Sequence, residues 1–390
     1  MVSSYGELVS KAKRVLEANR GNYGGREVVF PHREAYPAPF CWDTAFHVLA
    51  LNRYSPELAK ENIEALLQLQ RGDGLIPNSP LKRYDMDLRS QPPLIVYAVS
   101  DYYSKAKDYD NIRKWFPKLI RYLTWWRDWG CVFKKVKLLS PFSGSRDTNC
   151  LAFKAICSTG MDNHPIYDFC EGKTFRIGSN HYVPVFDLVL SSTYAMALES
   201  LISLATEVGM SNALKGLREE LEEIRRDFNE YLWSEEDSFY FPLTWQGDRV
   251  KVKSLQAALS LAAGIPDSGK AKKLVKVLEE EFLCDYGLLS VSKEDPKFLT
   301  PQPSWLKSED PYYWRGTIWA PLIVLCFIGL VRYGYKDLAE EIAKRFLKAV
   351  SKSGFSEYFT PEGGAGASNL EGFSWTAAAT IFLVREIGHY

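Results

Sequence analysis

The stretch LVLSSTYAMALESLISLATEVGMSNALKGLREELEEIRRDFNEYLW, residues 188–233, decides the fold. Its first part, 188–204, is nearly uncharged, whereas its second part, 213–233, places apolar residues every three to four positions among many charges. A nearly uncharged helix is typical of a buried position, and an amphipathic helix is typical of a position that faces water. The stretch therefore predicts an inner helix followed by an outer helix.

The same alternation runs along the whole chain of 390 residues. Apolar spacing and breaker residues predict twelve helices, at residues 4–19, 42–53, 55–71, 90–106, 109–129, 185–208, 211–232, 253–262, 267–282, 314–333, 335–352 and 370–387. Short turns join ten of them into five consecutive pairs, and the first and last helices are left to pair with each other. Loops of similar pattern at 73–76, 237–240, 286–289 and 353–356 suggest an internal repeat.

Six inner and six outer helices predict an all-α fold, an (α/α)6 barrel that forms a single domain over residues 1–390. The longest irregular region, about 130–185, is rich in Gly, Pro, Ser and Asn. A loop of this length is usually either functional or disordered, and its Phe, Tyr and Cys content argues against disorder. We expect it to form part of the rim of a cleft at one end of the barrel.

The composition excludes several classes of protein. Lys+Arg and Asp+Glu both number 48, so the basic surface of a nucleic-acid-binding protein is not expected. The N-terminal residues lack the pattern of a signal peptide, and no segment approaches the roughly 20 apolar residues of a membrane span. Seven cysteines without a CxxC pair argue against a zinc site. We expect a cytoplasmic protein, with one disulfide within residues 131–170 left open.

Two acidic residues stand in loops rich in small and aromatic residues. Asp162 lies in the segment STGMDNHP, 158–165, and Glu357 lies in GFSEYFTPEGGAG, 354–366. Inverting hydrolysis of an acetal needs one protonated carboxyl group and one carboxylate that deprotonates a water. We expect a raised pKa at Asp162, as a general acid requires, and an ionised Glu357 as general base.

Each acidic residue also has a simpler interpretation. Asp162 or Asn163 could only make an Asx turn before Pro165. Glu357 could be an ordinary solvated side chain, with Glu362 and Glu371 as nearby competitors. Glu362 is typical of a turn, and Glu371 is expected in the first turn of the last helix, where the helix dipole favours it.

Four clusters of aromatic and polar residues lie where inner helices are predicted to begin. They are Phe40-Cys-Trp-Asp43, Ser90-Gln-Pro-Pro93, Pro311 to Trp319, and Gly372-Phe-Ser-Trp375. The starts of inner helices share one barrel end, so we expect Trp42, Gln91, Trp314, Trp319 and Trp375 to line one pocket. Aromatic faces suit pyranose rings and amides suit sugar hydroxyls. Asp43 could instead be only a helix cap. The residues suggest neither a metal nor a cofactor.

Six motifs of the chain resemble, in this order, those of glycoside hydrolase family 63. They are Trp42-Asp43, Gln91-Pro-Pro93, Gly160-Met-Asp-Asn163, Tyr313-Trp-Arg-Gly316 with Trp319, Glu357-Tyr358 and Gly372-Phe-Ser-Trp375. Trehalases of family 37 share the scheme more loosely. The resemblance covers nearly the whole chain. Two departures are Thr317, where proline is usual, and Pro361-Glu-Gly-Gly364 after the base.

The resemblance implies an inverting α-glycosidase on an (α/α)6 barrel, acting on a small α-glucoside or α-mannoside such as a glycosylglycerate or a disaccharide. Its acid and base fall on Asp162 and Glu357. Its sugar-contacting positions fall on Trp42, Asp43, Gln91, Asn163, Trp314, Arg315 and Trp319, and Trp375 belongs to the same motifs. The implied partner is a small carbohydrate, without a cofactor.

Two other functions stay open at this point. Sugar 2-epimerases use paired histidines on the same barrel, and His47 in the first inner helix and His164 beside Asp162 could form such a pair. A carbohydrate-binding protein without catalysis would use the two acidic residues only as hydrogen-bond partners.

Overall fold

The computed structural model describes residues 2–145, 148–210, 212 and 214–388. Within these residues the chain is mostly helical, with thirteen α-helices and eleven short strands. Twelve of the helices lie where the hydrophobic pattern predicts them. The thirteenth, α6 (Leu151–Ile156), lies inside the 130–185 region, which the sequence leaves irregular.

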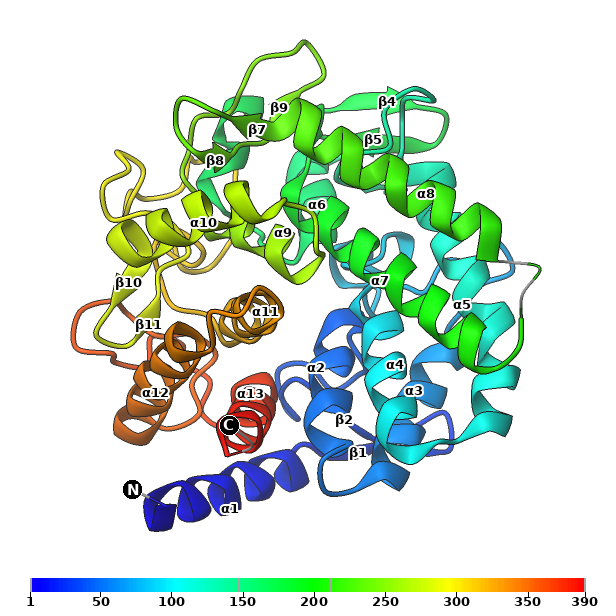
Figure 1. Ribbon diagram of the computed structural model, residues 1–390, viewed down its shortest axis with the longest axis vertical. Coiled ribbons are helices and arrows are strands. Elements are labelled where there is room, and N and C mark those ends of the chain that lie inside the picture. The colour runs from blue at the N-terminus through cyan, green and yellow to red at the C-terminus, as the bar shows by residue number, and fades with distance from the viewer. Residues whose placement is uncertain (1, 146–147, 211, 213, 389–390) are drawn as a thin grey trace.

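Six nearly uncharged helices surround the centre of the molecule (Figure 1). Each packs against the next, and the last packs against the first, so that they close a ring. In ring order they are α2 (Cys41–Leu51), α4 (Leu94–Ala106), α7 (Leu188–Glu207), α9 (Leu259–Ala262), α11 (Ala320–Arg332) and α13 (Ser374–Ile387).

The charged, amphipathic helices lie outside this ring (Figure 1). They are α1 (Val2–Ala18), α3 (Pro56–Gln68), α5 (Tyr109–Gly130), α8 (Leu214–Asp227), α10 (Ser268–Val277) and α12 (Lys336–Ser353). As expected, α3 packs on α2, α8 on α7 and α12 on α11, and α1 packs along α13. The pairing of the first helix with the last joins the two ends of the chain.

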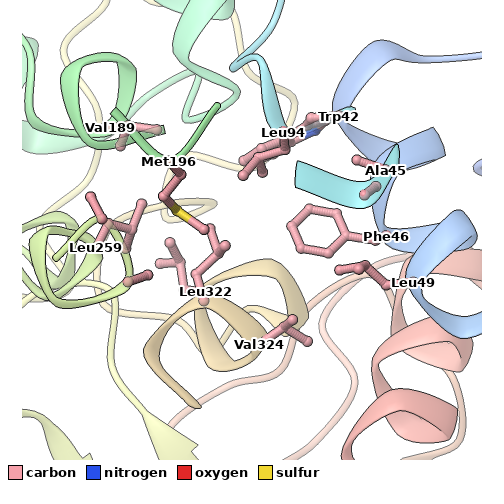
Figure 2. Close-up of a cluster of buried hydrophobic side chains, with 14 of the residues drawn as sticks. Trp42, Ala45, Phe46, Leu49, Leu94, Val189, Met196, Leu259, Leu322 and Val324 are labelled. Carbon is pink, nitrogen blue, oxygen red and sulfur yellow. The ribbon is translucent and has the colours of Figure 1, made fainter. Parts of the chain in front are cut away.

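The centre of the ring is filled with side chains. Figure 2 shows Phe46 of α2, Met196 of α7, Leu259 of α9 and Leu322 of α11 pointing toward one another, and all four are buried. A core packed at this density tolerates little change in volume. The packed centre of the ring therefore leaves no space for a ligand, so a binding site is expected in the loops at the ends of the ring.

Short strands, which the sequence does not predict, join the helices of this mostly helical fold. They are β1 (Arg20–Tyr23), β2 (Arg26–Val29), β3 (Phe142–Ser143), β4 (Phe175–Ile177), β5 (Asn180–Tyr182), β6 (Val185–Phe186), β7 (Trp233–Ser234), β8 (Phe239–Tyr240), β9 (Leu243–Thr244), β10 (Leu283–Cys284) and β11 (Gly287–Leu288). All their pairings are antiparallel. Most have only two or three residues, too few for an alternating pattern to be recognised in the sequence.

The internal repeat has a structural counterpart. Both α8 and α10 continue into a π-helical turn, at Phe228–Leu232 and Leu278–Phe282, and then into a two-stranded hairpin. The rings of Phe239 and Phe282 stack at 5.9 Å between the two units. These hairpins correspond to the repeated loops predicted at 237–240 and 286–289.

Five of the inner helices begin later than predicted, and the reason is clear for α4 and α11. Proline lacks the amide hydrogen of a helical residue, and α4 begins at Leu94, directly after Pro92 and Pro93. Residues 314–319 are not helical, because Gly316 has a φ of 122° and Ile318 makes a β-bridge with Phe359. Helix α11 therefore begins only at Ala320.

The expectation that no segment could span a membrane is wrong for α7 by length and composition. This 20-residue helix is apolar enough, but 83% of its apolar window is buried inside the structure. It packs on α4, α5, α8 and α9, as an inner helix should. All seven cysteines are free, so the disulfide left open within 131–170 is not formed.

Candidate active site

A cavity of about 590 Å³ opens at one end of the ring. Its walls come from the segments that precede α2, α4, α11 and α13, and from the loop after α6. Six residues singled out from the sequence line it: Trp42, Asp43, Gln91, Asp162, Glu357 and Trp375. Of the residues expected at the starts of inner helices, Trp42, Gln91 and Trp375 lie in the wall of this cavity.

Local backbone structure brings Asp162 beside the aromatic wall. Gly160 ends the turn after α6 with a φ of 76°. A Cβ atom at this position would lie 2.6 Å from the ring of Trp42, so only glycine lets the indole lie against this backbone. The loop that carries Asp162 and the first turn of α2 therefore form one continuous surface.

Two hydroxyl groups donate hydrogen bonds to the carboxyl group of Glu357. The Oη of Tyr313 donates a hydrogen bond of 2.5 Å to Oε1 of Glu357, and Oγ of Ser368 donates one of 3.2 Å to Oε2. The indole Nε1 of Trp375 donates to the backbone carbonyl of Glu357 at 2.8 Å. Glu357 is only 6% exposed, so it is not an ordinary solvated loop residue. Its competitors Glu362 and Glu371 are exposed and lie outside the cavity wall.

The cavity changes the protonation of its acidic groups. Burial raises the pKa of Asp162 to about 6, against the charge of Arg89 and a hydrogen bond from Cys157, which lower it. Burial also raises the pKa of Glu357 to about 7, although Tyr313 and Ser368 stabilise its carboxylate. The expectation that Glu357 stays fully ionised at neutral pH is therefore wrong, because burial of this loop could not be foreseen.

Asp43 is a third buried acid in the cavity. It stands in the first turn of α2, but the N-cap residue of this helix is Phe40, so the simple capping interpretation is wrong. Burial, together with the negative charges of Glu357 and Asp162, raises the pKa of Asp43 to about 8. A protonated Asp43 can donate a hydrogen bond to a ligand hydroxyl.

Two of the expected pocket residues, Trp314 and Trp319, lie behind the wall and do not line it. Their rings stack at 3.5 Å, and Trp319 also stacks on Tyr358 at 4.7 Å. They contact the lining rings of Trp42 and Trp375 from the back. The non-helical course of 314–319 turns these indoles inward, so they support the aromatic wall.

Asn163 and Arg315 also lie behind the wall. The side chain of Asn163 bonds to Gln302 and to the backbone of Asp310 and Trp314, which ties the loop of Asp162 to the segment before α11. These contacts across the site replace the Asx turn that the sequence left open. Arg315 is 1% exposed and binds Asp168 through both terminal nitrogens.

We predict that Arg315→Ala acts on stability and leaves sugar affinity intact. The change removes the bidentate partner of the Asp168 carboxylate, which is 14% exposed, and leaves Lys297 at 3.0 Å; losing a buried partner costs at most about 3–5 kcal/mol. Thermal unfolding should show a lower midpoint, whereas Arg345→Ala, which breaks a more exposed pair with Glu341, should have little effect. A higher KM at an unchanged midpoint would instead assign Arg315 to the sugar.

The two histidines proposed as an acid–base pair do not line the cavity. His47 bonds to Ser374 and His164 bonds to Ser254 and to the carbonyl of Ser290, and both are fully buried. Burial lowers the pKa of each to about 3. Nothing in this geometry favours the epimerase alternative. In the part of the chain that the structure describes, no group of three or more His, Cys, Asp or Glu is placed to hold a metal ion.

Several lining residues were not foreseen from the sequence. They include Tyr36, Asn78, Arg83, Arg89, Cys157 and Ser368. Of these, Arg89 is 1% exposed, and the Nδ2 atom of Asn78 is buried without a protein partner. Two of them stand near predicted motifs: Arg89 directly precedes the Ser90-Gln-Pro-Pro93 cluster, and Cys157 lies five residues before Asp162. The others stand in loops without a motif.

Known proteins resemble this chain over almost its full length. Mannosylglycerate hydrolase of Thermus thermophilus is 26% identical over 96% of this chain and 100% of its own length. Mannosyl-oligosaccharide glucosidase of Saccharomyces cerevisiae is 20% identical over 80% of this chain, but only 43% of the glucosidase is covered.

Solved structures share the fold. The family 63 mannosylglycerate hydrolase of Thermus thermophilus, in complex with glucose, has a TM-score of 0.79 at 23% identity and covers 97% of this chain and 100% of its own. Neutral trehalase Nth1 of Saccharomyces cerevisiae has a TM-score of 0.72 at 16% identity and covers 96% of this chain and 79% of its own.

The sequence profile of the mannosylglycerate hydrolase MGH1-like glycoside hydrolase domain matches residues 36–376. The match includes all of the candidate acidic residues and most of the cavity wall. Hydrolase membership also removes the alternative of a non-catalytic carbohydrate-binding protein. The chain belongs to the mannosylglycerate hydrolase MGH1-like family of glycoside hydrolases, within glycoside hydrolase family 63.

Proposed function

We propose that this glycoside hydrolase is an inverting α-glycosidase in which Asp162 is the general acid and Glu357 the general base. The observation that carries the proposal is the placement of both carboxyl groups, each with a raised pKa, in one cavity walled by Trp42 and Trp375. Asp162 gives its proton to the glycosidic oxygen while Glu357 takes a proton from the attacking water. An α-linked substrate then yields the β-anomer.

We propose a small α-mannoside or α-glucoside as substrate, with a glycosylglycerate as the leading candidate. The cavity is within the size range of sites that enclose small ligands. Relatives of similar length are mannosylglycerate hydrolases, and the Thermus enzyme has been solved with glucose and with Tris and D-glycerate. Asp43, Gln91 and Asn78 present polar groups that suit sugar hydroxyls.

The test is incubation with mannosylglycerate, glucosylglycerate, trehalose and aryl α-glycosides, followed by NMR of the released sugar. Release of sugar as the β-anomer from at least one of these supports the proposal. Release of the α-anomer contradicts inversion. No release from any of them contradicts the proposed substrate class.

The two raised pKa values predict a narrow pH optimum. The acid form of Asp162 is lost as pH rises through about 6, and the carboxylate of Glu357 is lost as pH falls through about 7. The productive combination is therefore a minor species that peaks between these values. The pH profile of kcat/KM should be a narrow bell, whose two limbs belong to the coupled pair. A broad plateau across both values would contradict this.

We further propose that the helices form an (α/α)6 barrel, that residues 1–390 act as one domain with 130–185 as part of its rim, and that the protein is cytoplasmic. The closed ring of inner helices supports the first proposal. The loop after α6 supplies Cys157, Gly160 and Asp162 to the cavity, which supports the second. The seven free cysteines support a reducing compartment.

A further inference from the structure

The side chain of Asn163 holds both ends of a turn that lies between the two loops of the proposed active site. Its Nδ2 atom donates a hydrogen bond of 3.1 Å to the backbone carbonyl of Asp310, and its Oδ1 atom accepts one of 2.8 Å from the backbone N–H of Trp314. Asn163 is fully buried and directly follows Asp162 in the chain. The loop of the proposed acid is therefore bonded to the turn 310–314 by a side chain with no exposed surface.

The same turn is bonded to the proposed base. The Oη of Tyr313 donates a hydrogen bond of 2.5 Å to Oε1 of Glu357. The hydroxyl of Tyr358, the residue after Glu357, donates to the carboxylate of Asp310. The turn thus makes one hydrogen bond to the base itself and one to the neighbour of the base. The two loops that carry the acid and the base are therefore joined through this turn.

The separation of the two carboxyl groups matters for the proposed reaction. Inversion needs a gap of roughly 6.5–9.5 Å between them, into which the attacking water fits. A misplacement of about 1 Å can lower a rate by about 100-fold. The carboxamide of Asn163 is suited to keep such a gap constant, because it donates and accepts at the same time. Its burial adds to this, since a buried partner that loses its hydrogen bond has no water to replace it.

We propose that Asn163 is a positioning residue that fixes the general acid and the general base relative to each other, by holding the turn 310–314 between their loops. This role rests on the proposed function of Asp162 and Glu357. It differs from the sugar contact that the resemblance to family 63 implies, since Asn163 is fully buried and lies outside the cavity wall. Asn163 touches no reacting atom and acts only through the two loops.

Asn163→Ala tests this role by kinetics. The change removes both hydrogen bonds to the turn, so kcat on an unactivated α-glycoside should fall by about 10- to 100-fold. The loss should be similar on the α-glycosyl fluoride, because fluoride leaves with little help from an acid but the water must still be placed. KM, and the calorimetric affinity for the released monosaccharide, should change little. Tyr358→Phe removes the hydroxyl on the other side of the turn and should give a smaller loss of the same kind.

Asn62→Ala is the matched control for a loss of stability. Asn62, in helix α3, is 1% exposed, and its amide likewise bonds to the backbone, at 2.9 Å to Val29 and 2.7 Å to Leu58. This variant should lower the thermal midpoint but keep the kcat and KM of the wild type. Equal losses of kcat in the two asparagine variants, or an unchanged kcat in Asn163→Ala, would overturn the proposal. So would a loss of sugar affinity in Asn163→Ala, or a loss of kcat confined to the unactivated glycoside.

Thermal unfolding tests the connection without using activity. Asn163→Ala and Tyr358→Phe each release one side of the turn, so the double variant should lose less in midpoint than the sum of the two losses. Asn62→Ala and Tyr358→Phe share no partner, and their losses should add. Additive losses for the first pair would overturn the connection. If the wild-type chain hydrolyses no glycoside, the proposed function fails, and the unfolding measurements still decide whether Asn163 is coupled to the loop of Glu357.

Discussion

Replacing Glu357 by glutamine lowers turnover on an α-glycoside by about 10²–10⁴-fold, the usual contribution of a general base. The amide keeps the size of the side chain and can still accept the hydrogen bond from Tyr313, but it cannot take a proton from water. The bond from Trp375 to the backbone of residue 357 is unaffected. Sugar binding, measured by calorimetry with the released monosaccharide, should therefore survive.

Glu362→Gln is the matched control, because Glu362 lies in the same loop, is exposed and is outside the cavity. It should retain wild-type turnover. Full activity in Glu357→Gln, or an equal loss in both variants, would remove Glu357 from the mechanism.

The same substitution should increase stability at alkaline pH. Burial raises the pKa of Glu357 from 4.5 to about 7 in the folded chain, so ionisation is less favourable there than in the unfolded chain. This penalty is absent at acid pH, grows as pH rises above 4.5, and is complete above 7. The thermal midpoint of Glu357→Gln should exceed that of the wild type at alkaline pH and approach it at acid pH. A group that lowers the stability of the fold but serves the reaction is typical of an active site.

The helices could be predicted because buried and solvent-facing helices differ in the number and spacing of their charged residues. The uncharged residues of 188–204 and the charged face of 213–233 correspond to α7 inside the ring and α8 outside it. Trp42, Asp43, Gln91 and Trp375 could also be placed, since a residue at the start of an inner helix has a defined height in the ring. Placing these residues required only the helix boundaries that the periodicity of the sequence predicts.

The errors concern side-chain direction and local environment. Trp314 and Trp319 stand next to the right helix, but the positive φ of Gly316 and the bridge from Ile318 to Phe359 turn them behind the wall. Similarly, Glu357 looks like an exposed loop residue until α13 and the 310–313 segment cover it. Both facts depend on contacts between residues far apart in the chain, for which one sequence has no local signal.

Asp162→Asn should also lower turnover on an unactivated α-glycoside by about 10²–10⁴-fold, because the amide has no proton of suitable acidity to give to the leaving oxygen. The two carboxyl variants should differ in their dependence on the leaving group. An α-glycosyl fluoride needs little acid assistance, so Asp162→Asn should recover much of its rate on this substrate. Glu357→Gln should not recover, since the attacking water still needs a base.

This difference assigns the two roles, which loss of activity alone cannot do. Asp73→Asn is the control, because Asp73 is a half-exposed residue of the loop after α3 and should behave as wild type on both substrates. Residual hydrolysis by Asp162→Asn should still release the β-anomer, since the acid takes no part in the direction of water attack. Recovery in Glu357→Gln without recovery in Asp162→Asn would exchange the assignments. An α-anomer as first product would replace inversion by a mechanism with a covalent intermediate, in which one of these carboxylates attacks the sugar directly.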